Sequence, residues 1–249
     1  MTPLSLLLGA CVGSFLNVCL IRWKSGGSLI SPASSCPHCK KAILKRDNIP
    51  LVSFFLLKGK CRFCRKPISR QYPAVEAATS LLFLLCSLRF PEKTEWLVAS
   101  FVLSSFLVLM TVSDLKWRLL PHSFNNFFIL AGLLFSTVLF PFSVFFSLGI
   151  VGGFVLLGSF LFGLTSFFPE GFGGGDIKMV AGLAIWLGVL KTFCVLIFAC
   201  FAASIAYWIL MRTKIIKHGW KIPFGPYLAM GTVWVWFWPE SIDCIGMEL

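Results

Sequence analysis

The chain has 249 residues, of which 57% are hydrophobic and only 13% are charged, and it carries a net charge of +12. Soluble domains average about 25% charged residues, so this composition excludes an ordinary soluble domain and predicts an all-α, polytopic membrane protein. Basic residues gathered beside apolar runs are better explained by membrane topology and by contact with anionic membrane lipid than by nucleic-acid binding.

Apolar runs predict about eight transmembrane helices, because most of them approach the roughly 20 residues that cross a bilayer. Basic residues follow the first run (Arg22 and Lys24) rather than precede it, which is the reverse of a signal peptide, so we expect a retained span. The sixth run is short, and we expect it to pack inside the helix bundle. The eight predicted spans are residues 4–20, 73–88, 96–112, 124–140, 142–168, 177–187, 191–211 and 224–238.

The distribution of basic residues predicts the orientation of these spans. Of the 22 lysines and arginines, 12 lie in residues 22–70, where Asp47 is the one acidic residue. When that segment is placed in the cytoplasm, only three basic residues fall on the outer side, as the positive-inside rule requires. These three are Arg89, Lys93 and Lys191.

The loop between the first two spans is predicted to be a small zinc domain. Its two C-x2-C pairs predict four thiolates on one structural zinc ion, with no open position for catalysis. Cytoplasmic thiols are kept reduced, which disfavours disulfides; redox thiols are the alternative interpretation. The predicted ligands are Cys36, Cys39, Cys61 and Cys64. The chain then has three predicted parts, a first span in residues 1–22, a cytoplasmic zinc domain in 23–72 and a membrane domain in 73–249.

Two aspartates lie at the edges of apolar runs. Asp114 follows the third predicted span, and Asp176 ends a Gly-Gly-Gly-Asp sequence ahead of the sixth. A carboxylate beside the hydrocarbon is energetically expensive and is therefore a candidate functional group. The alternatives are structural: Asp114 as a solvated helix-end carboxylate paired with Lys116 or Arg118, and Asp176 as a helix N-cap. Both aspartates are expected at the cytoplasmic face, where together they favour an acid–base pair acting on a peptide bond.

Peptide hydrolysis by two carboxylates requires one ionised group, which draws a proton from water, and one protonated group, which polarises the carbonyl. Asp114 is expected near a helix C-terminus, whose negative dipole end favours the protonated form. Asp176 is expected near a helix N-terminus, whose positive end favours the ionised form. We therefore expect Asp176 to be the general base and Asp114 the initial acid. The glycines before Asp176 leave the backbone open to an extended substrate peptide.

With these residues in this order, the chain resembles the bacterial type IV prepilin leader peptidases, membrane aspartic proteases that also process type II secretion pseudopilins. The resemblance spans almost the whole chain, and the conjunction of motifs is far more specific than a lone G-x-G-D. Besides the cysteine pairs, Asp114 and the Gly173–Asp176 motif, it is carried by Gly13-Ser14-Phe15-Leu16-Asn17-Val18, Arg46-Asp47-Asn48-Ile49-Pro50, the run PISRQYPAVE from Pro67 to Glu76, Leu120-Pro121 and Pro223-Phe224-Gly225-Pro226.

The resemblance implies cleavage of a short, basic leader after a glycine, at the cytoplasmic face of the bacterial inner membrane. It implies Asp114 and Asp176 as the catalytic pair and the four cysteines as zinc ligands. It also implies N-methylation of the new N-terminus with S-adenosylmethionine. Because the cytoplasmic loop is itself basic, attraction of the leader would fall to Asp47 and Glu76 or to lipid headgroups.

Two positions depart from the family pattern. His122 stands where Asp or Asn usually follows the Leu-Pro, and Arg65 stands where Gly often follows the fourth cysteine. Neither is a predicted catalytic or metal residue. Two other protein classes fit part of the sequence. A zinc-bearing membrane scaffold leaves the aspartates without a role, and a transporter predicts carboxylates near the bilayer midplane rather than at its margin.

Overall fold

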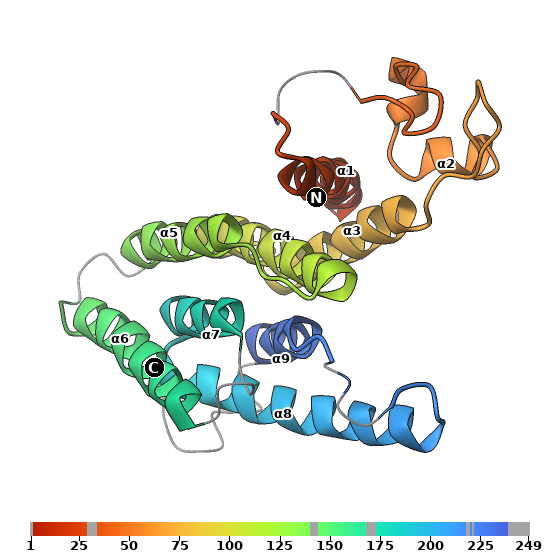
Figure 1. Ribbon diagram of the computed structural model, residues 1–249. Helices are drawn as coiled ribbons and strands as arrows, with labels where there is room; N and C mark the ends of the chain where they lie inside the picture. Colours follow the sequence, from red (N-terminus) through yellow and green to blue (C-terminus); the bar gives the residue numbers. More distant parts are fainter. Residues whose placement is uncertain are drawn as a thin grey trace. The chain divides into compact units, whose positions relative to one another are not determined.

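The computed structural model describes residues 2–28, 34–139, 144–167, 173–217, 220 and 222–238. In this part of the chain the structure is helical apart from isolated β-bridges, which confirms the predicted all-α class. The helices form two compact units, Met1–Leu109 and Met110–Leu249 (Figure 1).

Two long helices, α1 (Thr2–Ser25) and α3 (Gln71–Arg89), form the core of the first unit. Their backbones approach closely at Gly9 and Gly13, where an added Cβ atom would lie 2.6 Å and 2.7 Å, respectively, from a Cα atom of α3. Such pairs of small residues four apart let membrane helices pack backbone against backbone. The atom met at Gly13 is the Cα of Glu76, so this contact fixes α1 against the part of α3 that carries a buried carboxylate.

The cysteine-rich segment between α1 and α3 folds into two small knuckles joined by short helical turns. Each knuckle is closed by one antiparallel β-bridge, Ser35↔Ala42 in the first and Lys60↔Pro67 in the second. A 3₁₀ helix, η1 (Lys45–Asn48), and a short helix, α2 (Val52–Leu56), lie between the knuckles in sequence and contact each other.

Helix α4 (Thr94–Trp117) begins in the first unit and ends in the second. In the first unit, the ring of Phe101 stacks on that of Phe83 from α3, with 4.1 Å between the ring centroids. The last two turns of α4 belong to the second unit and carry Asp114.

The second unit is built around α7 (Gly174–Leu187), a helix of only 14 residues. It contacts all four other complete helices of the unit. These are α5 (His122–Leu139), α6 (Val144–Phe167), α8 (Val189–Arg212) and α9 (Gly225–Phe237). Most of the α7 side chains are buried, and Trp186 donates a hydrogen bond to the carbonyl of Phe128 in α5 at 3.1 Å. The expectation that the short sixth run packs inside the bundle is confirmed.

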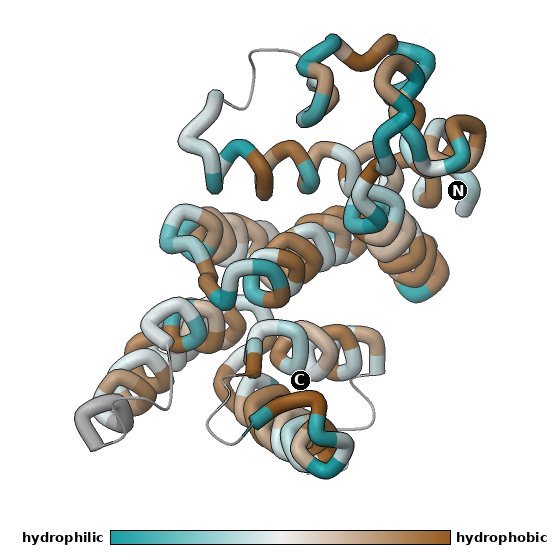
Figure 2. The backbone as a smooth tube through the Cα atoms, turned by 45° about the vertical axis from the view of Figure 1, so that its right-hand side comes forward, coloured by the Kyte–Doolittle hydropathy of each residue, from teal (hydrophilic) through white to brown (hydrophobic). Residues whose placement is uncertain are grey.

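Four helices in the described part of the chain are long and apolar enough to cross a membrane, namely α1, α3, α4 and α8. They correspond to the first, second, third and seventh predicted spans. Figure 2 shows hydrophobic residues (brown) along most of the helical backbone. Within α6, Gly152–Gly163 is a shorter apolar segment. Residues 140–143 and 168, at the edges of the predicted fourth and fifth spans, lie outside the described residues.

Candidate active site and metal centre

Asp114 lies in the last turn of α4 with its side chain buried, at 5% exposure. Its Oδ2 atom accepts a hydrogen bond of 2.7 Å from the backbone N–H of Gly225, at the start of α9. A Cβ atom at position 225 would lie 2.9 Å from that same oxygen, so glycine allows the approach. The alternative of a solvated helix-end carboxylate is therefore wrong. Sequence reasoning missed Gly225 as a partner of Asp114, although the Pro-Phe-Gly-Pro motif marked its position.

The chain turns sharply after α4 and holds the end of the helix in place. Arg118 adopts a left-handed conformation (φ 52°), and its N–H bonds to the carbonyl of Asp114 at 2.8 Å. The Arg118 guanidinium lies over the ring of Trp220, 4.6 Å from its centroid. The Ser113 hydroxyl donates to the carbonyl of Leu119 at 2.7 Å. These contacts fix the residues on either side of Asp114, which restricts the directions open to its carboxylate.

Asp176 occupies the first turn of α7 and is half-buried. Its Oδ2 atom accepts the backbone N–H of Gly173 at 3.3 Å, and its own N–H bonds to the Gly173 carbonyl at 2.9 Å. Gly173, rather than Asp176, is the N-cap residue, so the structural alternative proposed for Asp176 is wrong in detail. Asp176 and Asp114 lie close enough for their charges to interact, although 62 positions separate them in the sequence.

The glycine run before Asp176 packs on the turn that follows α4. A Cβ atom at Gly175 would lie 2.7 Å from the Cβ and 2.9 Å from the carbonyl oxygen of Leu120, whereas one at Gly174 would meet nothing within 4 Å. The Asn125 side chain donates from Nδ2 to the Gly175 carbonyl at 3.2 Å. Its Oδ1 atom is buried and has no hydrogen-bond partner within the described ranges. Leu120 and Asn125 therefore hold the backbone of Gly175 in place, and this fixes the position of the next residue, Asp176.

His122, one of the two departures from the family pattern, begins α5 beside the same site. Its Nδ1 atom lies 3.3 Å from the ammonium of Lys178, two residues after Asp176. An Asp at position 122 would offer Lys178 a carboxylate, whereas the histidine offers a ring nitrogen. The departure thus changes the partner of Lys178 and does not touch the hydrogen bonds of the two aspartates.

The four predicted cysteine ligands come together in the first unit. Their sulfur atoms all lie within 4.8 Å of one another, and the Sγ atoms of Cys36 and Cys64 are 3.9 Å apart. Tetrahedral zinc with Zn–S bonds of about 2.3 Å sets neighbouring sulfurs roughly 3.8 Å apart, so the cluster fits a four-thiolate zinc site. A hydrogen bond from the Cys39 backbone lowers the pKa of the Cys36 thiol to about 6, whereas burial and the neighbouring cysteines raise the pKa of the Cys64 thiol to about 11. Cys36 is therefore the thiol that ionises first and offers a thiolate to a metal ion.

The two knuckles repeat the same backbone geometry. In the first, Lys40 donates its N–H to the carbonyl of Cys36, and in the second, Arg65 donates to the carbonyl of Cys61, at 2.9 and 3.0 Å. Both donors are left-handed, with φ of 59° and 58°. This explains why the family often has glycine after the fourth cysteine, because glycine adopts the left-handed conformation without the penalty that Arg65 incurs.

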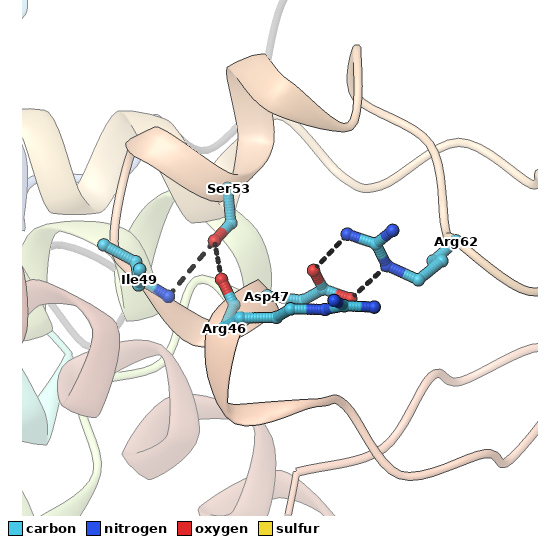
Figure 3. A network of polar contacts seen from close by, with 5 residues as sticks. All are labelled: Arg46, Asp47, Ile49, Ser53 and Arg62. Atoms are coloured by element: carbon cyan, nitrogen blue, oxygen red, sulfur yellow. Dashed lines mark hydrogen bonds and ion pairs between the residues drawn. The ribbon is translucent and has the colours of Figure 1, made fainter.

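Neither acidic residue expected to attract a basic leader has a free carboxylate. Asp47 forms a two-pronged ion pair with Arg62, at 2.6 and 2.7 Å (Figure 3). Arg62 also holds the pKa of Asp47 below its usual range. Glu76 is buried, and its Oε2 atom accepts the backbone N–H of Leu51 at 2.7 Å. Both groups therefore stabilise the cysteine-rich segment, and the expectation that they attract the leader is not supported.

An open groove of about 270 Å³ lies between α1 and the loop before α2. It is smaller than the roughly 300–1,000 Å³ typical of ligand sites. Its lining has two serines and one asparagine but no charged side chain that would match the carboxylate or the sulfonium of S-adenosylmethionine. The lining residues are Cys11, Ser14, Phe15, Val18, Ser34, Asn48 and Pro50. The groove does not fit that methyl donor.

Comparison with known proteins matches two consecutive parts of the chain to two related family models. Residues 7–90 match the bacterial peptidase A24 N-terminal domain, and residues 101–209 match the type IV leader peptidase family. The chain is 34% identical to the type 4 prepilin-like proteins leader peptide-processing enzyme of Escherichia coli O78:H11, over 94% of this chain and 92% of the relative.

Two prepilin leader peptidase/N-methyltransferases show similar likeness. That of Bacillus subtilis is 30% identical over 97% of this chain and 96% of its own length. That of Pseudomonas aeruginosa is 32% identical over 96% of this chain and 90% of its own length. No solved structure gives a significant match.

Proposed function

The chain belongs to the type IV leader peptidase family, and from this premise we propose that it is a membrane aspartic endopeptidase. Its substrates are the leader peptides of type IV prepilins or type II secretion pseudopilins, which it cleaves after a glycine. The observation that carries the proposal is that two carboxylates from distant parts of the sequence are brought into one compact unit, where the glycine run before Asp176 packs on the turn that follows Asp114. Asp114 is buried at the end of α4. Asp176 lies in the first turn of α7, close enough for the charge of Asp114 to act on it.

The two aspartates divide the acid and base roles. Asp176 takes a proton from water, whose oxygen then attacks the carbonyl carbon of the leader's last glycine. Asp114 gives its proton to the carbonyl oxygen, which forms a tetrahedral intermediate with two hydroxyl groups. As the C–N bond breaks, Asp176 passes the proton it took from water to the leaving amine, and Asp114 takes a hydroxyl proton back as the new carboxyl group forms. The C-terminus of α4 at Asp114 favours the protonated form of that carboxyl, and the N-terminus of α7 at Asp176 favours the ionised form, which supports these roles. The Gly225 N–H at the start of α9 acts in the opposite direction on Asp114, because it stabilises the ionised carboxylate.

The enzyme also methylates the new N-terminus, an activity that the names of the Bacillus subtilis and Pseudomonas aeruginosa relatives include. S-adenosylmethionine supplies an activated methyl group for that reaction. Cys36, Cys39, Cys61 and Cys64 would hold a structural zinc ion, a role supported by their mutual distances.

The chain crosses the bacterial inner membrane about eight times, with the aspartates at the cytoplasmic face. Helices α1, α3, α4 and α8 supply four spans by length and composition. Helices α5, α6, α7 and α9 supply the others; the 14-residue α7 packs inside the bundle, whereas the 13-residue α9 has one buried face and exposes Met230 and Trp234. The three-part division into residues 1–22, 23–72 and 73–249 then assigns the first span, the zinc domain and the peptidase domain. The basic segment between α1 and α3 supports this orientation.

The test uses purified protein in lipid nanodiscs and a prepilin-type peptide that contains the leader junction. Mass spectrometry follows the products, with and without S-adenosylmethionine, for wild type, Asp114→Asn and Asp176→Asn. Glu95→Gln is a matched control, because this exposed carboxylate lies at the opposite end of α4 from Asp114. We expect cleavage after glycine in wild type and control, its loss in both aspartate variants, and one methyl group added when the donor is present.

Cleavage that survives in either aspartate variant would refute the assigned pair. Cleavage without methylation would retain the peptidase and remove the transferase. The division of roles has its own test, because carboxyl ¹³C NMR of labelled aspartate can follow the two groups through a pH titration. Protonation of Asp176 at a higher pH than Asp114 would reverse the roles proposed here.

A further inference from the structure

The short helix α2 presents an apolar face that no other described part of the chain covers. Phe55 and Leu56 are 72% and 75% exposed, and Ile49 and Val52 are each 49% exposed. An isolated exposed apolar residue is ordinary, but four within eight positions form a patch. We propose that this face of α2 docks on the membrane surface, among anionic lipid headgroups, and anchors the cysteine-rich segment there.

The internal contacts of α2 direct this face outward. Ser53 is buried, and its hydroxyl accepts the N–H of Ile49 at 3.1 Å and donates to the carbonyl of Arg46 at 3.2 Å (Figure 3). The next residue, Phe54, packs against Gly59, where a Cβ atom would lie 3.2 Å from its ring. Ser53 is buried and Phe54 is partly buried, whereas Phe55, whose ring meets the edge of the Phe54 ring, and Leu56 remain exposed.

Two further contacts hold α2 beside the membrane helices of its own unit. Leu51, directly before α2, donates its N–H to the carboxylate of Glu76, the sixth residue of α3. Glu76 lies in the second turn of α3, so this contact holds α2 beside the start of a membrane helix. Interfacial helices bury their apolar face in the boundary between headgroups and acyl chains. The groove shared by Pro50 and the α1 residue Ser14 places the same loop beside a second membrane helix.

The backbone at Leu51 indicates that this placement is enforced. Leu51 has φ 60° and ψ −54°, and the N–H of Val52 bonds to the carbonyl of Pro50 at 2.6 Å, which together define a strained γ-turn. Such a conformation persists only where its surroundings over-determine it. The buried Glu76 carboxylate supplies that constraint, so α2 is held against α3 by a built contact.

The charge around α2 selects anionic lipid as the occupant. Residues 22–70 contain 12 basic residues, and their one acidic residue, Asp47, is already paired with Arg62. An exposed apolar turn within a segment this rich in basic residues matches headgroups of negative charge over acyl chains. The other plausible occupant is the apolar N-terminal helix of a prepilin. The basic leader attached to such a helix would be repelled by these same charges.

The experiment places the photoreactive residue p-benzoyl-phenylalanine at position 55 of the full-length protein. Nanodiscs are made either of phosphatidylcholine alone or of equal parts phosphatidylcholine and phosphatidylglycerol. After irradiation and digestion, mass spectrometry identifies what is attached to the peptide that contains position 55. The matched control carries the same residue at position 54, whose native side chain faces Gly59.

We expect lipid adducts at position 55, in at least about fivefold higher yield with phosphatidylglycerol, the effect of one basic residue near an anionic surface. Position 54 should give few lipid adducts. An absence of lipid adducts at position 55 in both lipids would overturn the proposal, as would equal yields in the two lipids. Replacement of the lipid adduct by a peptide adduct when a prepilin-type peptide is added would assign the face to the substrate instead. None of these outcomes depends on cleavage activity.

Discussion

The glycine run before Asp176 offers a sharp test of how the site is held, because two adjacent glycines have opposite surroundings. In Gly175→Ala the new Cβ atom would lie 2.7 Å from the Cβ and 2.9 Å from the carbonyl oxygen of Leu120. Ordinary contact begins near 3.5 Å, so the α7 N-terminus must move by up to about 1 Å. A backbone carbonyl cannot swing aside as the end of a flexible side chain can. In Gly174→Ala the new Cβ meets nothing within 4 Å.

Overpacking of this kind costs about 1–3 kcal/mol, and a catalytic group misplaced by about 1 Å loses on the order of a hundredfold in rate. We therefore expect Gly175→Ala to lower kcat for leader cleavage by about a hundredfold with a smaller change in KM. Gly174→Ala should stay within about twofold of wild type, because it makes the same chemical change without the contact. The assay is peptide cleavage in nanodiscs, with thermal unfolding and zinc content as checks on folding. Equal effects of the two variants, or a folded and fully active Gly175→Ala, would refute this account.

Three further perturbations test other contacts of the site. Gly225→Ala should lower cleavage at least about tenfold, because its Cβ would lie 2.9 Å from Asp114 Oδ2; a wild-type rate would remove Gly225 as a positioning contact. Cys61→Ser should abolish zinc measured by mass spectrometry, whereas Cys200→Ser, an exposed thiol on α8, should retain one zinc per chain. Arg65→Gly should stabilise the cysteine-rich segment by about 1 kcal/mol against chelator-induced unfolding, because it relieves a left-handed conformation; destabilisation would contradict that reasoning.

The sequence predicted the features that depend on local pattern. The all-helical class follows from apolar runs, and the burial of α7 follows from a run too short to cross a bilayer alone. The four-cysteine cluster follows from spacing, because each C-x2-C pair closes on itself within one knuckle. These predictions needed no knowledge of which helices are neighbours.

Contacts between segments far apart in the sequence could not be predicted from local sequence patterns. The hydrogen bond from Gly225 to Asp114 joins positions 111 apart, and no periodicity indicates which helix end meets which. Charge pattern alone left Asp47 and Glu76 as candidates for attracting a basic leader. The structure gives one of them an arginine and the other a backbone amide 25 positions away. A count of charges cannot show that a carboxylate is already occupied.

The family motifs acquire a common physical meaning from these contacts. Gly13, Gly175 and Gly225 each belong to a different motif, and a Cβ atom at any of them would come within 3.0 Å of a backbone or carboxylate atom. At Gly13 the neighbour is the helix that bears Glu76, at Gly175 it is the turn after Asp114, and at Gly225 it is Asp114 itself. Each motif therefore records a place where one segment must approach another without a side chain between them. A lone G-x-G-D specifies one such approach and is weak evidence for the site. The full set of motifs specifies close backbone contacts in both units of the chain. In the first unit the contact at Gly13 packs α1 on the helix that holds the cysteine-rich segment, and in the second unit the contacts at Gly175 and Gly225 position the two aspartates.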